Sequence, residues 1–390
     1  MRFSTATSDK KKIFADFLAV CPIAVDTFCT KCYNNINISM QTSFEKGDSM
    51  KQYLISGDMP QYRANLHSHS TLSDGNLTPE ELRALYQSNG YSILAITDHE
   101  LPKNHSHMSD KDFLMLTGYE AYVRPNPNYI FDPYEVEAHL NFFAKDPNNE
   151  TVICYNPASN KFFAKNHIDP DRMHRAGSER EREYSVEYLN EFIRTAVENG
   201  YLVSYNHPTW SMEDEERILS YENIFSLEID NFCSYQSNAI EHAGALYDKM
   251  LRRRKKIFCH AGDDNHNSHS LGSPKCDSFG AWTMILAKEL TYASVIEAME
   301  CGNMYASTGP RINEISIEDG KVHVESSPAR QIILFSGSKA PQSIIAEEGE
   351  SLTSADLKLD KIAPYFRISV VDERGHRASS RGFFRSEYIH

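Results

Sequence analysis

The feature that most constrains the fold is an alternation, beginning near residue 60, between short apolar segments and segments with helical spacing. The apolar segment 92–97 has the length of a buried strand. Thr78-Pro79-Glu80-Glu81 predicts a helix start, with Thr78 as N-cap and Glu81 completing a capping box. Gly90 predicts the end of that helix. Alternating strand and helix units predict an α/β protein with a mainly parallel sheet.

The remaining predicted elements extend this pattern. Further strands are expected at 62–67, 113–116, 138–143, 202–205, 225–229, 256–260 and 281–286, and helices between Ser185 and Gly200 and at 291–300. Seven or so strands over about 240 residues favour a barrel over an open sheet.

Three segments depart from the alternating pattern. Residues 1–49 are expected to be a leader that is disordered or foreign to the native protein, because Asp16 interrupts the apolar run that faintly resembles a signal peptide. Residues 145–184 are polar and irregular, which predicts a lid-like insertion within a 50–303 domain. Short strands expected at 312–317, 321–326, 331–335 and 365–371 predict a small all-β appendage over 304–390.

Potential metal ligands lie at the ends of the predicted strands. His67 and His69 follow the first strand, and side chains two residues apart in extended backbone point the same way. The carboxyl ends of the strands carry the chemistry in parallel α/β barrels, so ligands at these ends are expected to converge. The predicted metal ligands are His67, His69, Asp74, His99, Glu120, His139, His207, Asp264 and His266.

The spacing of His67 and His69 is weak evidence by itself, since His105 and His107 have the same spacing and are interpreted as exposed loop residues. A His, Asp or Glu at the end of about six successive strands is much harder to obtain by accident. Three neighbouring residues are interpreted as hydrogen-bonding partners or packed side chains rather than ligands: Asp98, His260 and Asp263.

Four motifs resemble those of the polymerase and histidinol phosphatase (PHP) superfamily. They are Asn65-Leu66-His67-Ser68-His69-Ser70-Thr71-Leu72-Ser73-Asp74-Gly75, Thr97-Asp98-His99, Asn206-His207-Pro208 and Gly262-Asp263-Asp264-Asn265-His266, the last with Asp263 where serine is more usual. The resemblance covers residues 62 to 310 or so. It implies a distorted (β/α)7 barrel that holds two or three divalent metal ions, usually zinc, manganese or iron.

The resemblance also implies how the ligands divide among the ions. One ion would take His67, His69, Glu120 and Asp264, a second would share Glu120 and add His139 and His207, and a third would take Asp74, His99 and His266. The expected catalytic residues are His67, His69, Asp74, Glu120, Asp264 and His266. Clustered divalent ions lower the pKa of a shared water, so that hydroxide can attack the substrate at neutral pH.

The expected function is a metal-dependent hydrolase, specifically a phosphoesterase acting on small phosphorylated or nucleotide substrates. Segments 204–211 and 305–310 look most like a PHP branch similar to the carbaryl-type aryl carbamate hydrolases, whose members also carry a β appendage after the barrel. Two alternatives therefore stay open: an aryl carbamate or amide hydrolase, and a non-catalytic metal-binding regulatory module.

Three residues are expected to contact the substrate. Arg175 and Arg182, in the lid-like insertion, could clamp a phosphate, although a solvated charged loop is the alternative for each. Trp210 could stack on an aromatic ring or a base, and a structural tryptophan is an equal alternative.

Composition limits the class of partner. The formal net charge of -14 makes duplex nucleic acid a poor partner, because an acidic surface repels polyanions. Nucleotides or short oligonucleotides are the largest nucleic acids that we expect to bind.

The cysteines and the apolar segments indicate the compartment. Only Cys29 and Cys32 among the eight cysteines have a CxxC spacing, so we expect reduced thiols and a cytoplasmic protein. No apolar run is long enough to span a bilayer. Mixed nitrogen and oxygen ligands suit Zn, Mn or Fe alike, and the oligomeric state has no signal in the sequence.

Overall fold

The computed structural model describes residues 51–126, 133–238, 242–360 and 362–388. These described residues belong to one compact unit, which runs from Gly47 to His390. The predicted leader lies outside the described residues. The division into a 50–303 domain and a 304–390 appendage stays a prediction.

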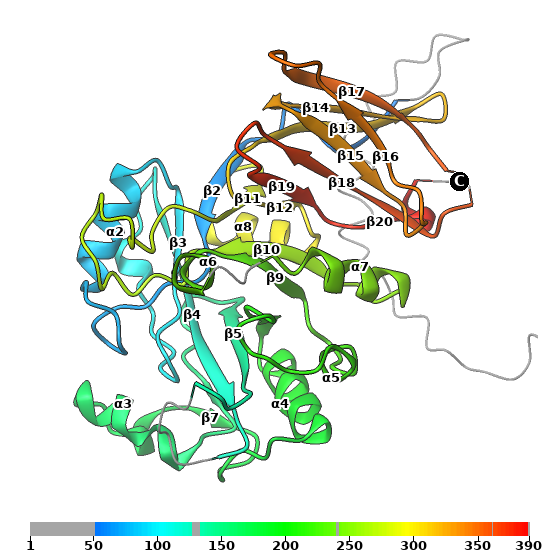
Figure 1. Cartoon of the computed structure of the whole chain (residues 1–390). Coiled ribbons are helices and arrows are strands. Elements are labelled where there is room, and N and C mark those ends of the chain that lie inside the picture. The colour runs from blue at the N-terminus through cyan, green and yellow to red at the C-terminus, as the bar shows by residue number, and fades with distance from the viewer. Residues whose placement is uncertain (1–50, 127–132, 239–241, 361, 389–390) are drawn as a thin grey trace, which may run out of the picture. The chain divides into compact units, whose positions relative to one another are not determined.

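The predicted ligands lie in, or in the segments that follow, the strands of one continuous series (Figure 1). In hydrogen-bonding order it runs β10 (Phe258–Gly262), β9 (Ser226–Asn231), β8 (Tyr201–Tyr205), β5 (Ala138–Ala144), β4 (Leu114–Val123), β3 (Ile93–Ile96), β2 (Gln61–Asn65) and β11 (Trp282–Leu286). The group β2, β3 and β4 is parallel, as is the group β8, β9 and β10. The expected parallel sheet is therefore correct for these two groups.

The strand β5 does not follow that expectation, because it runs antiparallel to both β4 and β8, and β11 runs antiparallel to β2. Antiparallel neighbours need no crossover helix, whereas parallel ones do. The reversed direction of β5 decides where His139 lies. His139 is near the start of β5, and this start lies at the same edge of the sheet as the carboxyl end of β8, as the pairing of Leu140 with Tyr205 shows.

The two ends of this series lie against each other. The hydroxyl of Thr283 in β11 accepts a hydrogen bond from the backbone N–H of Ala261 in β10 (3.1 Å) and donates one to the backbone carbonyl of the same residue (2.8 Å). This side-chain contact is compatible with closure of the strands, and the (β/α)7 barrel stays a prediction.

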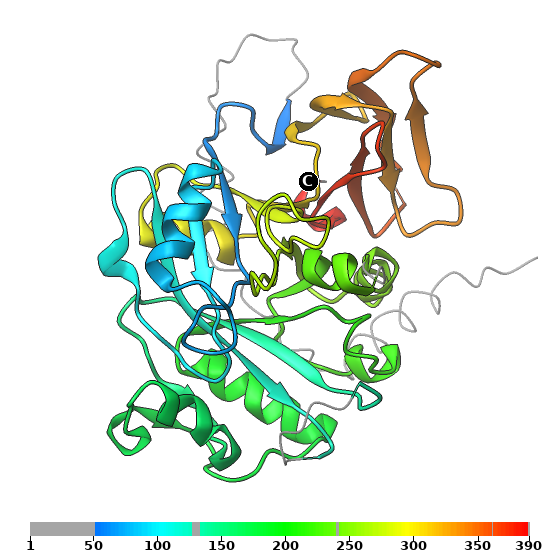
Figure 2. The same ribbon diagram turned by 60° about the vertical axis from the view of Figure 1, so that its left-hand side comes forward.

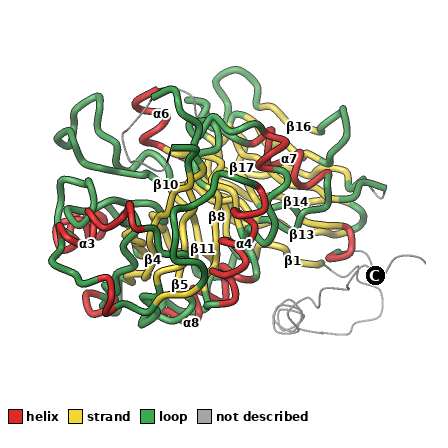
Figure 3. The backbone as a smooth tube through the Cα atoms, turned by 90° about the horizontal axis from the view of Figure 1, so that it is seen from below, coloured by secondary structure: helices red, strands yellow, loops and turns green. Residues whose placement is uncertain are grey.

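Helices lie outside the strands, as α3 and α8 do in Figure 3. The predicted capping box of α2 (Pro79–Ser88) is confirmed: Thr78 accepts from the N–H of Glu81, and the Glu81 carboxylate accepts from the N–H of Thr78. Ser185 is the N-cap of α4 (Val186–Glu198), and this helix buries its apolar face against the core. Thr291 is the N-cap of α8 (Tyr292–Glu300). The other helices among the described residues are α3 (Asn160–Lys165), α5 (Glu215–Ile218), α6 (Phe232–Asn238) and α7 (Gly244–Arg252), with single 3-10 turns at Ser106–Met108 and Arg385–Glu387.

The expected lid-like insertion contains only short elements. They are β6 (Val152–Ile153), β7 (Arg175–Ala176), α3 and two 3-10 turns, Pro157–Ser159 and Pro170–Arg172. Two of its side chains reach the loop after β2: Lys165 Nζ donates to the carbonyl of Ser73, and Asn166 Nδ2 donates to that of Leu72 (2.7 Å). The insertion thus packs on the loop that carries Asp74.

The C-terminal strands form two further layers (Figure 2). In one layer β12 (Met304–Ser307) joins β11 to β19 (Arg377–Ser380), followed by β18 (Tyr365–Val371), β15 (Gln331–Phe335) and β16 (Gln342–Ile345), with β20 (Phe383–Phe384) on β18. The other layer is β1 (Gln52–Ile55), β13 (Ile312–Glu318), β14 (Lys321–Ala329) and β17 (Leu352–Lys358). An apolar core lies between the layers. Since β1 precedes the alternating region and pairs with β13, this all-β part draws on both ends of the described chain.

The cysteines and helices bear on two of the sequence expectations. Among the described cysteines, Cys154, Cys233, Cys259 and Cys276 carry free thiols, as expected, whereas Cys301 is disulfide-bonded, so the expectation of reduced thiols is wrong for Cys301. Among the described residues, no helix combines the length and the apolarity that crossing a bilayer requires.

Candidate metal centre

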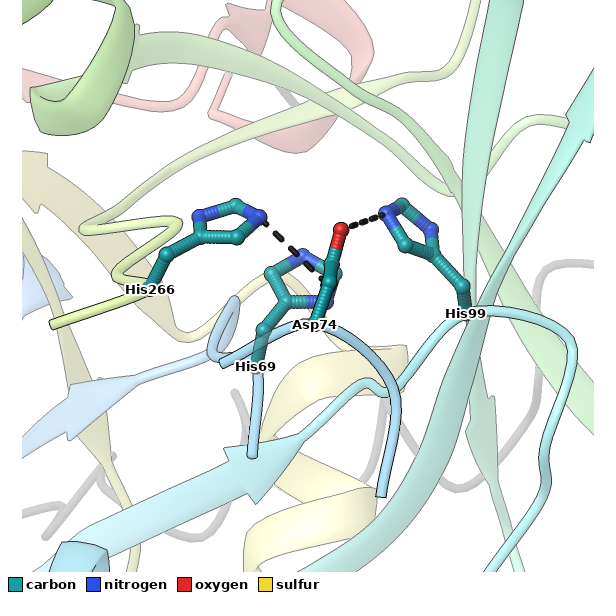
Figure 4. A group of neighbouring side chains, drawn as sticks. All are labelled: His69, Asp74, His99 and His266. Carbon is teal, nitrogen blue, oxygen red and sulfur yellow. Dashed lines mark ion pairs between the residues drawn. The ribbon is translucent and has the colours of Figure 1, made fainter. Parts of the chain in front are cut away.

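The nine predicted metal ligands come together around the carboxylate of Glu120. Five imidazoles approach this carboxylate with nitrogen–oxygen distances of 3.1–3.5 Å: His67, His69, His99, His139 and His207. The carboxylate of Asp264 lies 3.2 Å from His67 and 3.0 Å from His69. Asp74 completes the set, at 3.4 Å from His99 and 3.6 Å from His266 (Figure 4).

Glu120 lies within β4 rather than after it, which differs from the expected strand end. Residues 121–123 continue the strand because they pair with 138–140 of the antiparallel strand β5. An isolated parallel bridge also joins Glu120 to His99, immediately beyond β3. Pairing on both sides fixes the backbone of Glu120, so its buried carboxylate is held at the centre of the site.

The ligand atoms fall into three overlapping groups, each with all members within 4.8 Å of one another. The groups are His69, Asp74, His99 and His266; His67, Glu120 and His207; and His67, His69 and Asp264. The first contains the whole of the expected third set together with His69. His139 lies outside these groups, although its Nδ1 is 3.1 Å from Glu120.

The spacing of these atoms fits divalent cations. Ligand atoms bound at about 2.1 Å to one ion lie about 3.0–3.4 Å apart, for octahedral or tetrahedral geometry respectively. The nitrogen–oxygen distances around Glu120 and Asp264 are in or near this range. Moreover, His67 Nε2, His69 Nε2 and His99 Nδ1 are buried and make no hydrogen bond among the described residues. A buried imidazole nitrogen that makes no hydrogen bond can offer its lone pair to a metal ion when the ring is neutral.

The outer nitrogens of the same rings are held by other groups. Glu228 Oε1 lies 3.0 Å from His67 Nδ1, the backbone carbonyl of Asp264 lies 2.9 Å from His266 Nδ1, and Glu137 Oε2 lies 3.4 Å from His139 Nε2. Carboxylate or carbonyl partners of this kind orient metal-binding histidines and raise their basicity. Sequence reasoning missed Glu228, and a signal existed, since it is a charged residue inside the predicted buried strand 225–229.

Buried charge shapes the electrostatics of the site. Burial disfavours protonation of His67, but the neighbouring carboxylates, Asp264 first, outweigh burial and raise its pKa well above the usual value. The imidazoles in turn hold the pKa of Glu120 well below its usual range, against the effect of burial. Positive charge therefore compensates the buried carboxylates, and bound cations would supply the same compensation.

The three residues interpreted as hydrogen-bonding or packed neighbours are all buried, with different partners. Asp263 accepts from the N–H groups of residues 279–281 and from Tyr86, and burial raises its pKa to about 6. His260 contacts Ser226 (3.1 Å), and burial lowers its pKa to about 4. Asp98 accepts from the backbone and hydroxyl groups of Ser70 and Ser73. It therefore shapes the loop before Asp74.

Unusual backbone conformations occur at the centre. His207 and Asp264 adopt positive φ angles of 26° and 54°, which non-glycine residues rarely do. Gly75 makes a close approach possible, because a Cβ at this position would lie 2.2 Å from the carbonyl oxygen of His69. The positive φ angles of His207 and Asp264 are strained; strain of this kind costs about 1–3 kcal/mol per residue and is typical of functional sites.

The residues expected to contact substrate have different surroundings. The half-buried Trp210 lies edge-on to His139 and His207, with ring centroids 5.2 and 4.9 Å away, so it borders the centre. Arg182 is buried and pairs through both terminal nitrogens with Glu100. This placement argues against the phosphate-clamping role of Arg182, because a buried ion pair already uses its charge.

Arg175 and His105 lie in environments that the sequence did not indicate. Arg175 bonds Asp171 (2.7 Å) and Glu179 (2.9 Å) and stacks on Tyr155, and its role in binding substrate stays a prediction.

His105 and His107 differ in exposure. The expectation of an exposed loop residue is correct for His107 but wrong for His105, which is 4% exposed.

Comparison with known proteins gives one family match. Residues 65–242 match the model of the PHP domain, and this range holds every predicted ligand except Asp264 and His266. No curated protein matches the sequence.

Solved structures that resemble the chain include the following three. A two-domain protein from Bacteroides vulgatus, containing a predicted PHP-like metal-dependent phosphoesterase, has 13% identity and a TM-score of 0.40, with 88% of this chain and 91% of that chain covered. A candidate metal-dependent phosphoesterase from Bifidobacterium adolescentis has 14% identity and a TM-score of 0.32, covering 57% and 94%. An amidohydrolase from Chromobacterium violaceum, with bound sulfate and no metal, has 17% identity and a TM-score of 0.32, covering 52% and 87%. Residues 65–242 of this chain are therefore similar to the PHP domain, and the described residues include His, Asp and Glu clusters that could bind metal ions.

Proposed function

We propose that this protein is a metal-dependent phosphoesterase acting on small phosphorylated or nucleotide substrates. The observation that carries the proposal is the convergence of five imidazoles on the Glu120 carboxylate, with Asp264 and Asp74 beside them. Several of these imidazole nitrogens are buried and make no hydrogen bond among the described residues, so a metal ion shared with the neighbouring carboxylates would satisfy them.

The proposed roles of the protein groups follow from their contacts. Glu120 would contribute to more than one ion, because its Oε1 lies beside His139 and His207 and its Oε2 lies beside His99. Asp74, His99 and His266 would hold a further ion at the more exposed side of the centre. Divalent ions bound there would activate water and neutralise charge on the phosphoryl group.

A lysine in the insertion supports an anionic substrate. Lys161 belongs to α3, in the insertion that packs on the loop carrying Asp74, and burial, followed by the charge of Arg124, lowers its pKa to about 8. Arg124 itself is buried and pairs with Glu137, so its charge is already used. We assign Lys161 to the phosphate, and Trp210 to an aromatic or base group of the substrate.

The test is a screen of the purified protein loaded with Mn, Zn or Fe. p-Nitrophenyl phosphate and bis-p-nitrophenyl phosphate probe the proposed activity, and an aryl carbamate probes the alternative, with metal content measured on the same samples. Phosphate ester turnover that chelator abolishes is the expected result. Carbamate turnover alone would favour the carbamate hydrolase, and bound metal without any turnover would favour a regulatory module.

Two substitutions test whether this site carries the activity. His67→Ala and Glu120→Ala are each expected to lower turnover by about 10²-fold or more, since removing one catalytic electrostatic group commonly costs that much. Bound metal should fall in parallel while the circular dichroism spectrum is retained. His107→Ala is the matched control, because this exposed histidine is not at the centre. Full activity in both variants would refute the assignment.

A further inference from the structure

A second donor cluster lies beside the centre and includes two residues outside the predicted ligand set. One ligand atom from each of Cys233, His266 and Asp277 lies within 4.8 Å of the others. The backbone N–H of Cys233 donates to the carbonyl of Asp263 (2.9 Å), which ties the start of α6 to the loop before His266. Asp277 is buried and accepts from the N–H of His266 (2.8 Å). Thiolate, imidazole and carboxylate together form a donor set that suits zinc.

His266 belongs to both clusters but has one available lone pair. Its Nδ1 lies 2.9 Å from the carbonyl of Asp264 and must carry the ring proton, because a carbonyl oxygen can only accept. Its Nε2 lies 3.6 Å from Asp74 and is shown pointing towards that carboxylate in Figure 4. Only Nε2 can therefore bind a metal ion, and it can serve one cluster at a time.

We propose that Cys233, Asp277 and His266 Nε2 form an inhibitory site for zinc or another thiophilic divalent ion. An ion bound there takes His266 away from the cluster of His69, Asp74 and His99, so excess zinc empties or weakens that part of the centre. Binding converts the thiol to a thiolate and releases its proton to solvent. The inhibition rests on the proposed function, whereas the binding does not.

Cobalt spectroscopy tests the binding without any measurement of activity. Full-length protein already loaded with Mn²⁺ is titrated with Co²⁺ alongside Cys233→Ser and Cys276→Ser. Cys276 is a matched control, since this half-buried thiol lies on the same loop as Asp277 but outside the cluster. A thiolate-to-cobalt charge-transfer band is expected in the wild type and in Cys276→Ser, and not in Cys233→Ser. No band in the wild type, or an unchanged band in Cys233→Ser, would overturn the proposal.

A second measurement uses the unmodified chain and so does not depend on how a variant folds. Zn²⁺ is expected to slow alkylation of Cys233 by iodoacetamide by at least about tenfold, because a metal-bound thiolate is a poor nucleophile towards the reagent. The rate at Cys276, followed in the same digest by mass spectrometry, should not change. Equal rates at Cys233 with and without zinc would contradict the site.

The inhibition is tested on protein that turns over phosphate ester. Cys233→Ser should require about tenfold more zinc for half inhibition than the wild type or Cys276→Ser, the scale on which a ligand change alters metal affinity. Inhibition unaffected by Cys233→Ser overturns the competition for His266. Absence of turnover in every protein would count against the proposed function, and the cobalt and alkylation results would still decide the binding site.

Discussion

At the scale of single residues, the centre depends on side chains that hold the metal-binding histidines as much as on the histidines themselves. Glu228 is fully buried and contacts three parts of the site: His67 Nδ1 (3.0 Å), the N–H of His207 (3.0 Å) and Asn231 Nδ2 (2.9 Å). Such a carboxylate fixes the tautomer and the orientation of its histidine. Its role is therefore one of positioning, since it faces the outer side of the ring.

Glu228→Gln is expected to weaken metal binding by about tenfold, because the amide keeps the shape but removes the charge that makes His67 a stronger donor. The measurement is competition against a chelating dye, with circular dichroism to confirm the fold. Glu222→Gln, an exposed neighbour before the same strand, is the control and should bind metal like the wild type. Unchanged affinity in Glu228→Gln would show that the contact with His67 is unimportant.

His105 gives a pH-dependent prediction. Burial lowers its pKa to about 4, so the folded chain does not take up the proton that the unfolded chain binds below about pH 6.5. Stability from this residue is present above pH 6.5 and is lost as the pH falls towards 4. Between pH 7 and pH 5 the wild type should lose about 2 kcal/mol more unfolding free energy than His105→Leu.

Urea denaturation at the two pH values measures this difference. His107→Leu is the matched control, because it alters the exposed neighbour in the same turn and should keep the wild-type pH dependence. An identical pH dependence in the wild type and His105→Leu would refute the prediction.

At the scale of elements, a buried ion pair ties the irregular insertion to the strand β4 and to the segment after β3. Arg182 bonds both oxygens of Glu100, which directly follows His99, and also the carbonyl of Tyr122 in β4. Each partner is buried, so neither can be solvated if the other is removed. The pair thus links the insertion to the segment that carries one of the predicted ligands.

Arg182→Met should cost about 3–5 kcal/mol of unfolding free energy, because it leaves the Glu100 carboxylate buried without its partner. Arg180→Met, at an exposed position two residues away, should change stability by less than about 0.5 kcal/mol. Thermal and urea unfolding of both variants provide the measurement. A raised KM in Arg182→Met with wild-type stability would instead revive its predicted role in substrate binding.

At the scale of the whole molecule, the C-terminal strands are joined to the metal-binding part by contacts that a detachable domain would not make. β12 continues the sheet from β11, Arg367 pairs with Asp248 of α7 (2.7 Å), and the N–H of Gly382 donates to Tyr247 (2.9 Å). Loss of these strands would expose the edge of β11 and the apolar surface beneath β12.

A fragment of residues 50–303 is therefore expected to be unfolded or aggregated. Size-exclusion chromatography and limited proteolysis measure this outcome, and the full chain is the control. Both proteins are compared under reducing conditions, because Cys301 is disulfide-bonded. A monomeric 50–303 fragment with a cooperative unfolding transition would show that the predicted domain boundary is also a folding boundary.

The sequence alone was enough to predict the nine residues that the structure brings together as possible metal ligands. It was also enough to predict where several helices begin. The capping box at Thr78, the N-cap at Ser185 and the alternation of strands and helices are local, so they could be predicted from neighbours along the chain. The strand-end ligands could also be predicted, because strand direction and side-chain alternation limit where each imidazole points.

Only the tertiary structure decided how these groups share their partners. The reversal of β5, the burial of His105, the pairing of Arg182 with Glu100 and the contact of Glu228 with His67 all join residues far apart in sequence. No local pattern specifies such pairs, because each depends on which surfaces packing brings together. For the same physical reason the neighbouring cluster of Cys233, His266 and Asp277 becomes visible only in three dimensions.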